Sequence, residues 1–382
     1  AMVSARKAFN KWKQIPAVKR GSLLETVADL IQHHRSEFVV LLAKEAGKTL
    51  ADAINEIREA IDFCRYYASV GTQQFQQPVH LAGYTGEKNT LLLEGRGIIL
   101  CISPWNFPLS IFTGQISAAL MAGNCVVAKP ASATSIIAYR VIELFYEAGF
   151  ARDLIQLLPA RADIIEQSIL SDPALSGVAF TGSHQTAQHV NRLLAHRHGA
   201  IIPLIAETGG INVMLADSSS LSEQLVRDIV LSAFGSAGQR CSALRAVFIQ
   251  DDVYQHVMQQ IRGAMQELII GDPLDFATDI GPLINQKAVN KVLLHIEHMR
   301  NKGLNVISLG QLKQQGKNFV LPTLIELDSI AQLTQEIFGP VLHVIRYQYG
   351  EIETIIDQVN QTGFGLTFGL HLSLIHISEP TR

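Results

Sequence analysis

The chain has 382 residues, of which 48% are hydrophobic and 17% are charged, and its formal net charge is -3 at pH 7. This length and composition support two or three lobes around a large core, and the slightly negative charge excludes the basic field that binding to nucleic acid or to an anionic membrane requires. The four cysteines show no CxxC spacing, which predicts unpaired thiols in a reducing compartment, and we expect a cytoplasmic location.

The N-terminal part of the chain has a helical pattern. It opens on the charged, amphipathic run AMVSARKAFNKWKQ, which lacks the apolar stretch of a signal peptide and which we interpret as internal to a longer protein. Apolar residues then recur at helical spacing between residues 17 and 68, among them Leu24, Val27 and Ile31. This period predicts amphipathic helices.

A long uncharged stretch lies between Arg96 and Lys129, and it would be long enough to cross a bilayer. It contains residues that break a helix or carry polar groups: Pro104, Asn106, Pro108, Gln115, Gly123 and Asn124. Lipid cannot satisfy these groups, so the stretch predicts no membrane span, but two buried strands joined by a loop and a short helix.

Short apolar runs alternate with helical segments over the rest of the chain. Strands are predicted at 97–103, 125–130, 154–159, 177–183 and 201–207, and helices at 134–148 and near 185–195. A second block has predicted helices near 221–235 and 253–269 and strands at 246–249 and near 341–346. This alternation is typical of parallel sheets covered by helices, so we expect two α/β lobes.

The run FGSAGQRCSA sets Cys241 among small and polar residues. A cysteine that serves packing normally lies among Val, Ile, Leu and Phe. Small neighbours instead leave backbone N–H groups open and let a substrate approach, which is what a nucleophilic thiolate needs. Cys241 is therefore the predicted nucleophile.

Two strand ends have the chemistry of a cofactor site. In AFTGSHQTA, Gly182 and Ser183 join a strand to a helix whose first N–H groups could hold a phosphate, although an ordinary turn explains the run equally well and GxGxxG is absent. In VVAKPASAT, Lys129 ends a strand, where its ammonium could hold ribose hydroxyls or simply lie in solvent.

Three further polar residues are candidates, each with an alternative. Glu207, between an apolar strand and two glycines, is expected to be partly desolvated and to act as a general base, or else to cap a helix or form an ion pair. Asn106, in the stiff loop SPWNFP, could donate to an oxyanion or hold a turn. Glu336, in QEIFGPVL, is a polar anchor in an apolar wall or a surface residue, and spacing leaves this open.

Two other kinds of site receive no support. The 13 histidines form no ligand spacing with cysteines or carboxylates, so no metal site is predicted. There is no GxSxG run, so a serine hydrolase is not predicted either.

Taken together and in this order, these segments resemble the aldehyde dehydrogenase superfamily from about residue 5 to about residue 371. The resemblance implies an α/β, aldehyde dehydrogenase-like fold. An atypical Rossmann NAD-binding lobe would span residues 1–206, with the N-terminal helices and a flap strand near 85–96. A truncated α/β catalytic lobe would span 207–371.

The same resemblance implies roles for the candidates. The implied catalytic residues are Cys241 as nucleophile, Asn106 as oxyanion donor and Glu207 as the base that activates water to hydrolyse a thioester. The implied contacts to NAD come from Lys129 and Glu336 at the riboses, Gly182 and Ser183 at the pyrophosphate, and Ser103, Trp105, Ser132 and Phe338.

Within the superfamily, the runs ISPWNFPLS, IPLIAETGG and SAGQRCSALR are most similar to the glutamate-γ-semialdehyde (pyrroline-5-carboxylate) dehydrogenase module of the proline utilization A proteins. This implies NAD-dependent oxidation of L-glutamate γ-semialdehyde to L-glutamate, with Ser242 and Phe107 at the substrate. In those proteins FAD belongs to an upstream proline dehydrogenase, and the intact parent would form a homo-oligomer.

Departures from the family pattern qualify these expectations. Ser132 stands where many relatives have a Glu that contacts the adenosine ribose, so NADP remains open beside NAD. Residues 372–382 are expected to be a non-native tail in place of a substrate-anchor loop and of a strand that would pair with the flap. A general aldehyde dehydrogenase and a non-catalytic scaffold therefore remain the alternatives.

Overall fold

The computed structural model describes residues 1–313, 316 and 318–373, and the chain forms two compact units. Unit 1 comprises Ala1–Ala46 and Ala53–Thr208. Unit 2 comprises the short segment Gly47–Asp52 and the chain from Gly209 onward. The division into lobes at residues 206 and 207 stays a prediction, and most of the predicted tail at 372–382 lies outside the described residues.

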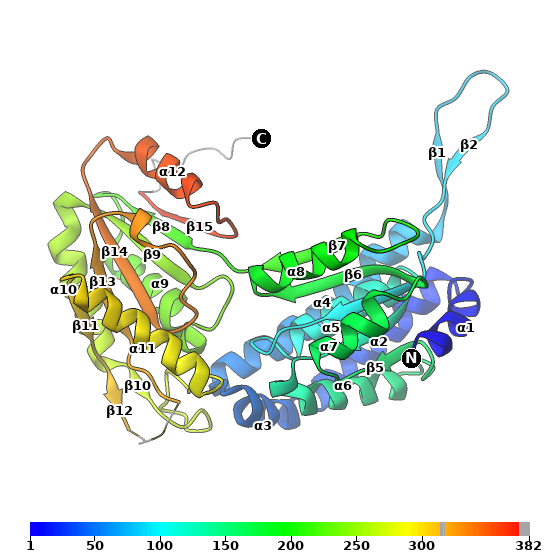
Figure 1. Ribbon diagram of the computed structural model, residues 1–382, viewed down its shortest axis with the longest axis horizontal. Coiled ribbons are helices and arrows are strands. Elements are labelled where there is room, and N and C mark those ends of the chain that lie inside the picture. The colour runs from blue at the N-terminus through cyan, green and yellow to red at the C-terminus, as the bar shows by residue number, and fades with distance from the viewer. Residues whose placement is uncertain (314–315, 317, 374–382) are drawn as a thin grey trace. The chain divides into compact units, whose positions relative to one another are not determined.

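Four helices precede the first sheet, as the helical period predicts (Figure 1). They are α1 (Met2–Trp12), α2 (Ala17–His33), α3 (Arg35–Ala46) and α4 (Leu50–Gln76). In α2 the side chains of Leu24, Val27 and Ile31 are fully buried. Their spacing of three and four residues puts them on one face of the helix, so burial of apolar surface holds this helix in the core.

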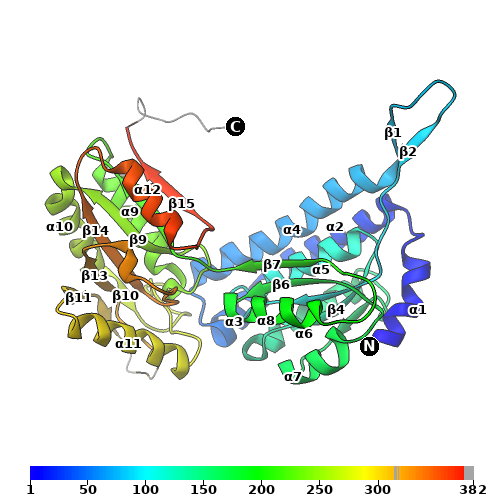
Figure 2. The same cartoon turned by 45° about the horizontal axis from the view of Figure 1, so that its top comes forward.

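Unit 1 contains a parallel sheet of five strands in the order β5-β4-β3-β6-β7. The strands are β3 (Ile98–Ile102), β4 (Cys125–Lys129), β5 (Ile155–Leu157), β6 (Leu175–Gly182) and β7 (Leu204–Thr208). The helices that follow them are α5 (Ser110–Met121), α6 (Ser135–Glu147), α7 (Ala162–Ile165) and α8 (His184–Ala195). Figure 2 shows α4 on one side of β6 and β7 and α8 on the other. The predicted parallel sheet is confirmed, as are the two strands in the uncharged stretch.

A short antiparallel hairpin of β1 (Val79–Leu81) and β2 (Asn89–Leu91) precedes the sheet. The flap strand predicted near 85–96 is thus shorter than expected and pairs within the chain. A turn brings the two strands together, with the Glu87 N–H donating to the Tyr84 carbonyl at 2.9 Å. Every residue of both strands is exposed.

Unit 2 contains a six-stranded sheet in the order β11-β13-β14-β9-β8-β15. Its strands are β11 (Val306–Ser308), β13 (Thr323–Leu327), β14 (Val341–Tyr347), β9 (Leu244–Gln250), β8 (Asn212–Ala216) and β15 (Phe368–His371), and all neighbours pair in parallel except β11 and β13. A two-stranded pair joins β10 (Ile269–Ile270) to β12 (Gln311–Leu312). The helices are α9 (Ser222–Phe234), α10 (Asp251–Glu267), α11 (Gln286–Asn301) and α12 (Ile352–Gln361).

Strand β14 shows how the unit 2 sheet is covered on both faces. Its Arg346 lies 5.4 Å from the Tyr254 ring of α10, whereas its His343 contacts His295 of α11 at 2.9 Å. Residues 343 and 346 point to opposite faces because side chains alternate along a strand. The sheet is therefore sandwiched between α10 and α11, and the predicted α/β fold class is confirmed. In the described part of the chain no helix is both long and apolar enough to cross a membrane.

Candidate active site

Cys241 lies in a loop between α9 and β9 whose backbone is strained. The preceding 3₁₀ turn, Gly235–Gly238, contains Ser236 and Ala237, both with φ of 55°. A left-handed conformation costs a residue with a side chain about 1–2 kcal/mol. The turn is held by the buried carboxylate of Asp52, which accepts the Ser236 N–H at 3.1 Å and pairs with Arg240. All of these groups belong to unit 2, so the strain is offset locally.

Cys241 differs from the other three cysteines in access. Its side chain is partly exposed, whereas Cys64, Cys101 and Cys125 are buried. Burial raises the pKa of each of those three thiols to about 12. Burial also raises the pKa of Cys241, but the backbone N–H groups of Ser242 and Cys241 lower it, as does Arg245, while Glu336 raises it. The pKa of Cys241 is raised on balance, and the backbone donors and Arg245 offset part of that rise. Cys241 is therefore set apart by access, as the thiol that a small molecule can reach.

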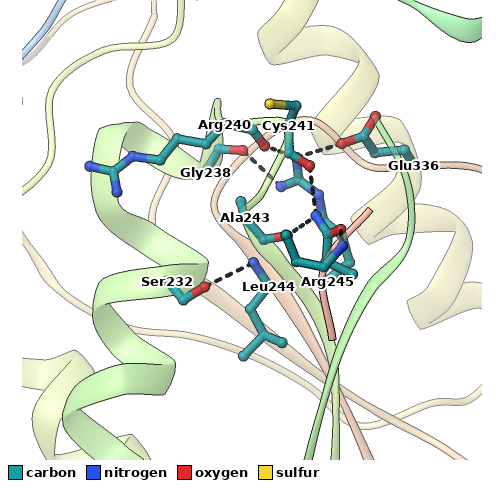
Figure 3. A network of polar contacts seen from close by, with 10 residues as sticks. Ser232, Gly238, Arg240, Cys241, Ala243, Leu244, Arg245 and Glu336 are labelled. Carbon is teal, nitrogen blue, oxygen red and sulfur yellow. Dashed lines mark hydrogen bonds and ion pairs between the residues drawn. The ribbon is translucent and has the colours of Figure 1, made fainter. Parts of the chain in front are cut away.

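The loop around Cys241 is fixed by Arg245 of β9 (Figure 3). Arg245 Nη1 donates to the Gly238 carbonyl at 2.7 Å, and its Nη2 donates to the Arg240 carbonyl at 2.8 Å. The same Nη2 donates to Glu336 Oε1 at 2.8 Å. One guanidinium thus joins the Cys241 loop to Glu336.

A second buried side chain fixes the loop from β8. Asn212 Nδ2 donates to the carbonyls of Cys241 at 2.6 Å and Ala243 at 2.9 Å. Its Oδ1 accepts the Thr367 N–H at 3.1 Å. Asn212 is 2% exposed, so these bonds form away from competing water and hold the backbone firmly.

Glu336 and Phe338 both contact Arg245. Burial raises the pKa of Glu336, whereas the charge of Arg245 lowers it. The Phe338 ring lies 5.2 Å from the Arg245 guanidinium. The sequence left open whether Glu336 is an anchor or a surface residue, and the structure gives it a buried arginine partner. Ser242 is exposed.

In unit 1, the loop that follows β3 carries Ser103, Trp105, Asn106 and Phe107. Asn106 is 7% exposed and Ser103 is 5% exposed, and the Ser103 N–H donates to the Lys129 carbonyl at 3.1 Å. The loop ends at α5, whose first N–H groups are accepted by the buried carboxylate of Glu56, with Leu109 N at 2.8 Å. Glu56 therefore pins the end of the loop that presents Asn106.

Three candidate cofactor contacts lie at the carboxyl ends of β4 and β6. Lys129 is the last residue of β4, its Nζ donates to the Pro130 carbonyl at 3.2 Å, and burial lowers its pKa. Ser132, three residues further along the chain, is exposed. Gly182 ends β6, and Ser183 caps α8, with its Oγ accepting the Thr186 N–H at 3.3 Å. Because β4, β3 and β6 are parallel neighbours, these residues and the Asn106 loop share one edge of the sheet.

Glu207 is exposed, so the expectation of partial desolvation is wrong. It lies in β7, which is the edge strand of the unit 1 sheet, and the middle residues of β7 are exposed. An apolar run predicts a strand but not its position within the sheet, and a strand at the edge leaves one side open. The role of Glu207 as a base stays a prediction.

The candidates thus form two groups, one in each unit. The structure brings Cys241, Ser242, Glu336 and Phe338 together in unit 2, and the loop after β3, Lys129, Gly182 and Ser183 together in unit 1. The sequence did not single out the residues that support them: Asp52, Glu56, Asn212 and Arg245. Arg245 alone had a signal, a charged residue within the apolar run LRAVFI. Among the described residues, no three His, Cys, Asp or Glu side chains gather as metal ligands would.

Comparison with known proteins relates this geometry to other chains. The profile of the "Aldehyde dehydrogenase family" matches residues 1–373. The bifunctional protein PutA of Salmonella typhimurium is 45% identical over 369 residues, which are 94% of this chain and 27% of PutA. The 1-pyrroline-5-carboxylate dehydrogenase of Geobacillus kaustophilus is 33% identical over 374 residues, 96% of this chain and 72% of that protein.

Two solved structures are similar along almost the whole chain. A mutant of proline utilization A (PutA) from Bradyrhizobium japonicum superimposes with a TM-score of 0.94 at 46% identity and covers 97% of this chain and 38% of its own. The 1-pyrroline-5-carboxylate dehydrogenase from Thermus with bound NAD has a TM-score of 0.91 at 30% identity, covering 97% of this chain and 72% of its own. The chain therefore spans little more than a quarter of the length of the bifunctional relatives it matches.

Proposed function

Because the chain belongs to the aldehyde dehydrogenase family, we propose that it oxidises L-glutamate γ-semialdehyde to L-glutamate with NAD, the second step of proline catabolism. The observation that carries the proposal is the loop of Cys241. It presents the one partly exposed thiol among the four, beside backbone N–H donors, and two buried side chains hold it in place. The semialdehyde as substrate is supported by relatives named PutA and 1-pyrroline-5-carboxylate dehydrogenase.

The residues of the site suit NAD. The pyrophosphate is an anion, and the start of α8 with Gly182 and Ser183 offers backbone N–H groups and a hydroxyl. The two riboses offer hydroxyls, which the ammonium of Lys129 and the carboxylate of Glu336 would bind. Ser103, Trp105 and Phe338 would line the rest of the cofactor. Ser132 offers a neutral hydroxyl at the adenosine ribose, so NADP is the second cofactor to test.

In the proposed reaction, the Cys241 thiolate attacks the aldehyde carbon and forms a thiohemiacetal. The side-chain amide of Asn106 and the backbone N–H of Cys241 donate to the oxygen, which becomes negative as the bond forms. NAD, when bound, would accept the hydride from the substrate carbon, and the oxyanion then becomes a carbonyl, so the thiohemiacetal is converted into a thioester. Glu207 then takes a proton from water, which attacks the thioester and releases glutamate and the Cys241 thiol. The balance is aldehyde, NAD and water to acid, NADH and a proton.

Two residues would set the preference for the semialdehyde. Its α-carboxylate distinguishes it from simple aldehydes, and the exposed hydroxyl of Ser242 next to the nucleophile is the proposed donor to that group. Phe107 would contact the carbon chain. A general aldehyde dehydrogenase would lack this preference, and a scaffold would lack turnover altogether.

The test is NADH formation by the folded chain with NAD and glutamate semialdehyde, beside propanal. Cys241→Ser should abolish turnover, whereas Cys64→Ser, at a buried thiol 3.5 Å from the Ser117 hydroxyl, should retain it. Equal rates with propanal would favour the general enzyme. If the chain is folded and binds NAD but forms no NADH with either aldehyde, the proposed activity is contradicted. A cytoplasmic location and a homo-oligomeric parent with an upstream FAD domain stay predictions.

A further inference from the structure

Arg245 is an unusual residue for its position. It lies in β9, whose seven residues are all buried, and its side chain is 1% exposed. Burying a guanidinium is costly even when it is paired, and a buried ion pair can often be replaced by apolar residues without loss of stability. Stability of the sheet alone therefore does not account for an arginine here.

The partners of Arg245 all belong to two short segments. Gly238 and Arg240, whose carbonyls accept its two terminal nitrogens, precede Cys241 directly. Glu336, which accepts the same Nη2, and Phe338, whose ring the guanidinium faces, belong to the other segment. The segments also touch directly, because a Cβ on Gly238 would lie 2.9 Å from Pro340 N and closer still to the Gly339 carbonyl.

We infer that Arg245 is a positioning residue that ties the Cys241 loop to Glu336, so that the reactivity of the thiol depends on the charge and placement of Glu336. The inference deepens the proposed function, since Cys241 and Glu336 are its proposed nucleophile and ribose ligand. Arg245 itself touches neither the aldehyde nor the reacting atoms in this scheme.

The geometry explains why the residue is an arginine. A guanidinium is planar and presents several donors in a fixed fork, so it can bond two carbonyls and a carboxylate at once while its face packs on Phe338. A lysine at this position would carry the same charge on a single nitrogen. It could bond one or two of these acceptors, and the rest would remain buried without a donor.

The charged surroundings of the thiol single out the same pair. Glu336 and Arg245 are the charged groups that act on Cys241, and they act with opposite sign. Arg240, which is next to Cys241 in the chain, is paired with Asp52.

Two histidines pack behind Arg245, and they add no charge. His343 Nδ1 lies 2.8 Å from the Arg245 carbonyl. The other ring nitrogen of His343, Nε2, lies 2.9 Å from His295 Nε2. Burial lowers the pKa of His343 to about 3 and of His295 to about 4, so both are neutral at neutral pH. Changes at Arg245 or Glu336 should therefore reach the thiol without compensation from these rings.

The experiment is the alkylation of the folded chain by iodoacetamide as a function of pH, without aldehyde or cofactor. Cys241→Ser supplies the background from the buried thiols. The variants are Arg245→Met, Arg245→Lys, Glu336→Gln and the double variant Arg245→Met/Glu336→Gln. Arg262→Met is the matched control, because Arg262 makes an arginine–glutamate pair of the same 2.8 Å length, with Glu326, elsewhere in unit 2.

Arg245→Met should raise the apparent pKa of Cys241, because it removes the positive charge and leaves Glu336 unpaired. A rise of one unit slows alkylation at neutral pH about tenfold. Glu336→Gln should accelerate alkylation, and the double variant should return toward the rate of the unchanged chain. Arg245→Lys should lie between Arg245→Met and the unchanged chain, and Arg262→Met should match the unchanged chain.

The double variant separates positioning from a merely structural role. If Arg245 only supported the fold, Glu336→Gln would not restore a loop that Arg245→Met had released. An unchanged pH profile in folded Arg245→Met, or no recovery in the double variant, would overturn the inference. If Arg245→Met does not fold, the single variant Glu336→Gln decides, and an unaltered alkylation rate there would overturn it.

The outcome is independent of the proposed function. A chain that oxidises no aldehyde but shows these alkylation shifts would contradict the function and retain the positioning role. A chain that oxidises the semialdehyde and shows no alkylation shift in any of the variants would support the function and contradict the positioning role.

Discussion

Replacing Gly238 by Ala tests whether close backbone packing fixes the Cys241 loop. Gly238 has φ of +67°, which costs an alanine about 1–2 kcal/mol. The added Cβ would meet Pro340 N at 2.9 Å and the Gly339 carbonyl closer still, and overpacking of this kind costs about 1–3 kcal/mol. Alanine also lowers the conformational entropy of the unfolded chain, which offsets about 0.5–1 kcal/mol of this loss. The free energy of unfolding should therefore fall by about 1–4.5 kcal/mol.

In a unit of this size that loss lowers the thermal midpoint by about 2–18 °C, which scanning fluorimetry would measure. Alkylation of Cys241 should change as well, since the Gly238 carbonyl is one of the Arg245 acceptors. The control is Gly263→Ala in α10, where a Cβ meets nothing within 4 Å and where alanine should stabilise the helix by about 0.5–1 kcal/mol. A Gly238→Ala chain as stable and as reactive as the unchanged one would refute the packing argument.

Three further predictions concern buried polar groups. Asn212→Ala should lower the free energy of unfolding by about 2–4 kcal/mol and alter Cys241 alkylation, because two carbonyls and an N–H lose their partner; urea denaturation beside Asn290→Ala, on the exposed surface of α11, would check this. Glu56→Gln should cost about 1–2 kcal/mol in thermal stability, since a charged acceptor at the start of α5 becomes neutral, and a chain with an unaltered midpoint would speak against that. His343 and His295 have lowered pKa values in the folded chain, so the unfolded chain binds more protons between pH 6.5 and 4 and acid destabilises the fold. From pH 7 to 5.5 the loss should be about 2–3 kcal/mol in urea titrations, and it should vanish when both residues are Gln.

The five strands of the parallel sheet in unit 1 could be predicted because each contains a short apolar run that ends at a residue that stops a strand. Lys129 with Pro130 ends β4, and Gly182 with Ser183 ends β6. The position of a strand within the sheet could not be predicted in the same way. The runs of β6 and β7 look alike in sequence, yet β7 is the edge strand, and this is why Glu207 is exposed.

In unit 2 the sequence predicted fewer of the elements. The strands β9 and β14 each contain a short apolar run and were predicted, whereas β8, β13 and β15 were not. β15 contains Gly369 and, among the strands that the structure describes, pairs with β8 alone, so its strand conformation depends on a partner more than 150 residues earlier in the chain. Local sequence carries no sign of such a partner.

The nucleophile was easier to predict than its support for a physical reason. Cys241 reveals itself through its immediate neighbours, since small residues open the backbone around it. Asn212 lies 29 residues before it and Asp52 lies 189 before, and each acts through hydrogen bonds that only the folded chain forms. Spacing along the sequence therefore cannot identify them.

Arg245 combines a local sequence signal, like that of Cys241, with partners that only the folded chain reveals, like those of Asn212. Its position in β9 explains how it can fix the Cys241 loop. It is four residues from Cys241, close enough in sequence to be noticed, yet its meaning depends on Glu336, which is 91 residues further on. A strand fixes where a side chain points far more firmly than a loop does, and β9 is central in its sheet, with β14 on one side and β8 on the other. The loop that carries Cys241 thus gains its geometry from the strand that follows it, through one buried arginine whose terminal nitrogens bond two carbonyls and a carboxylate.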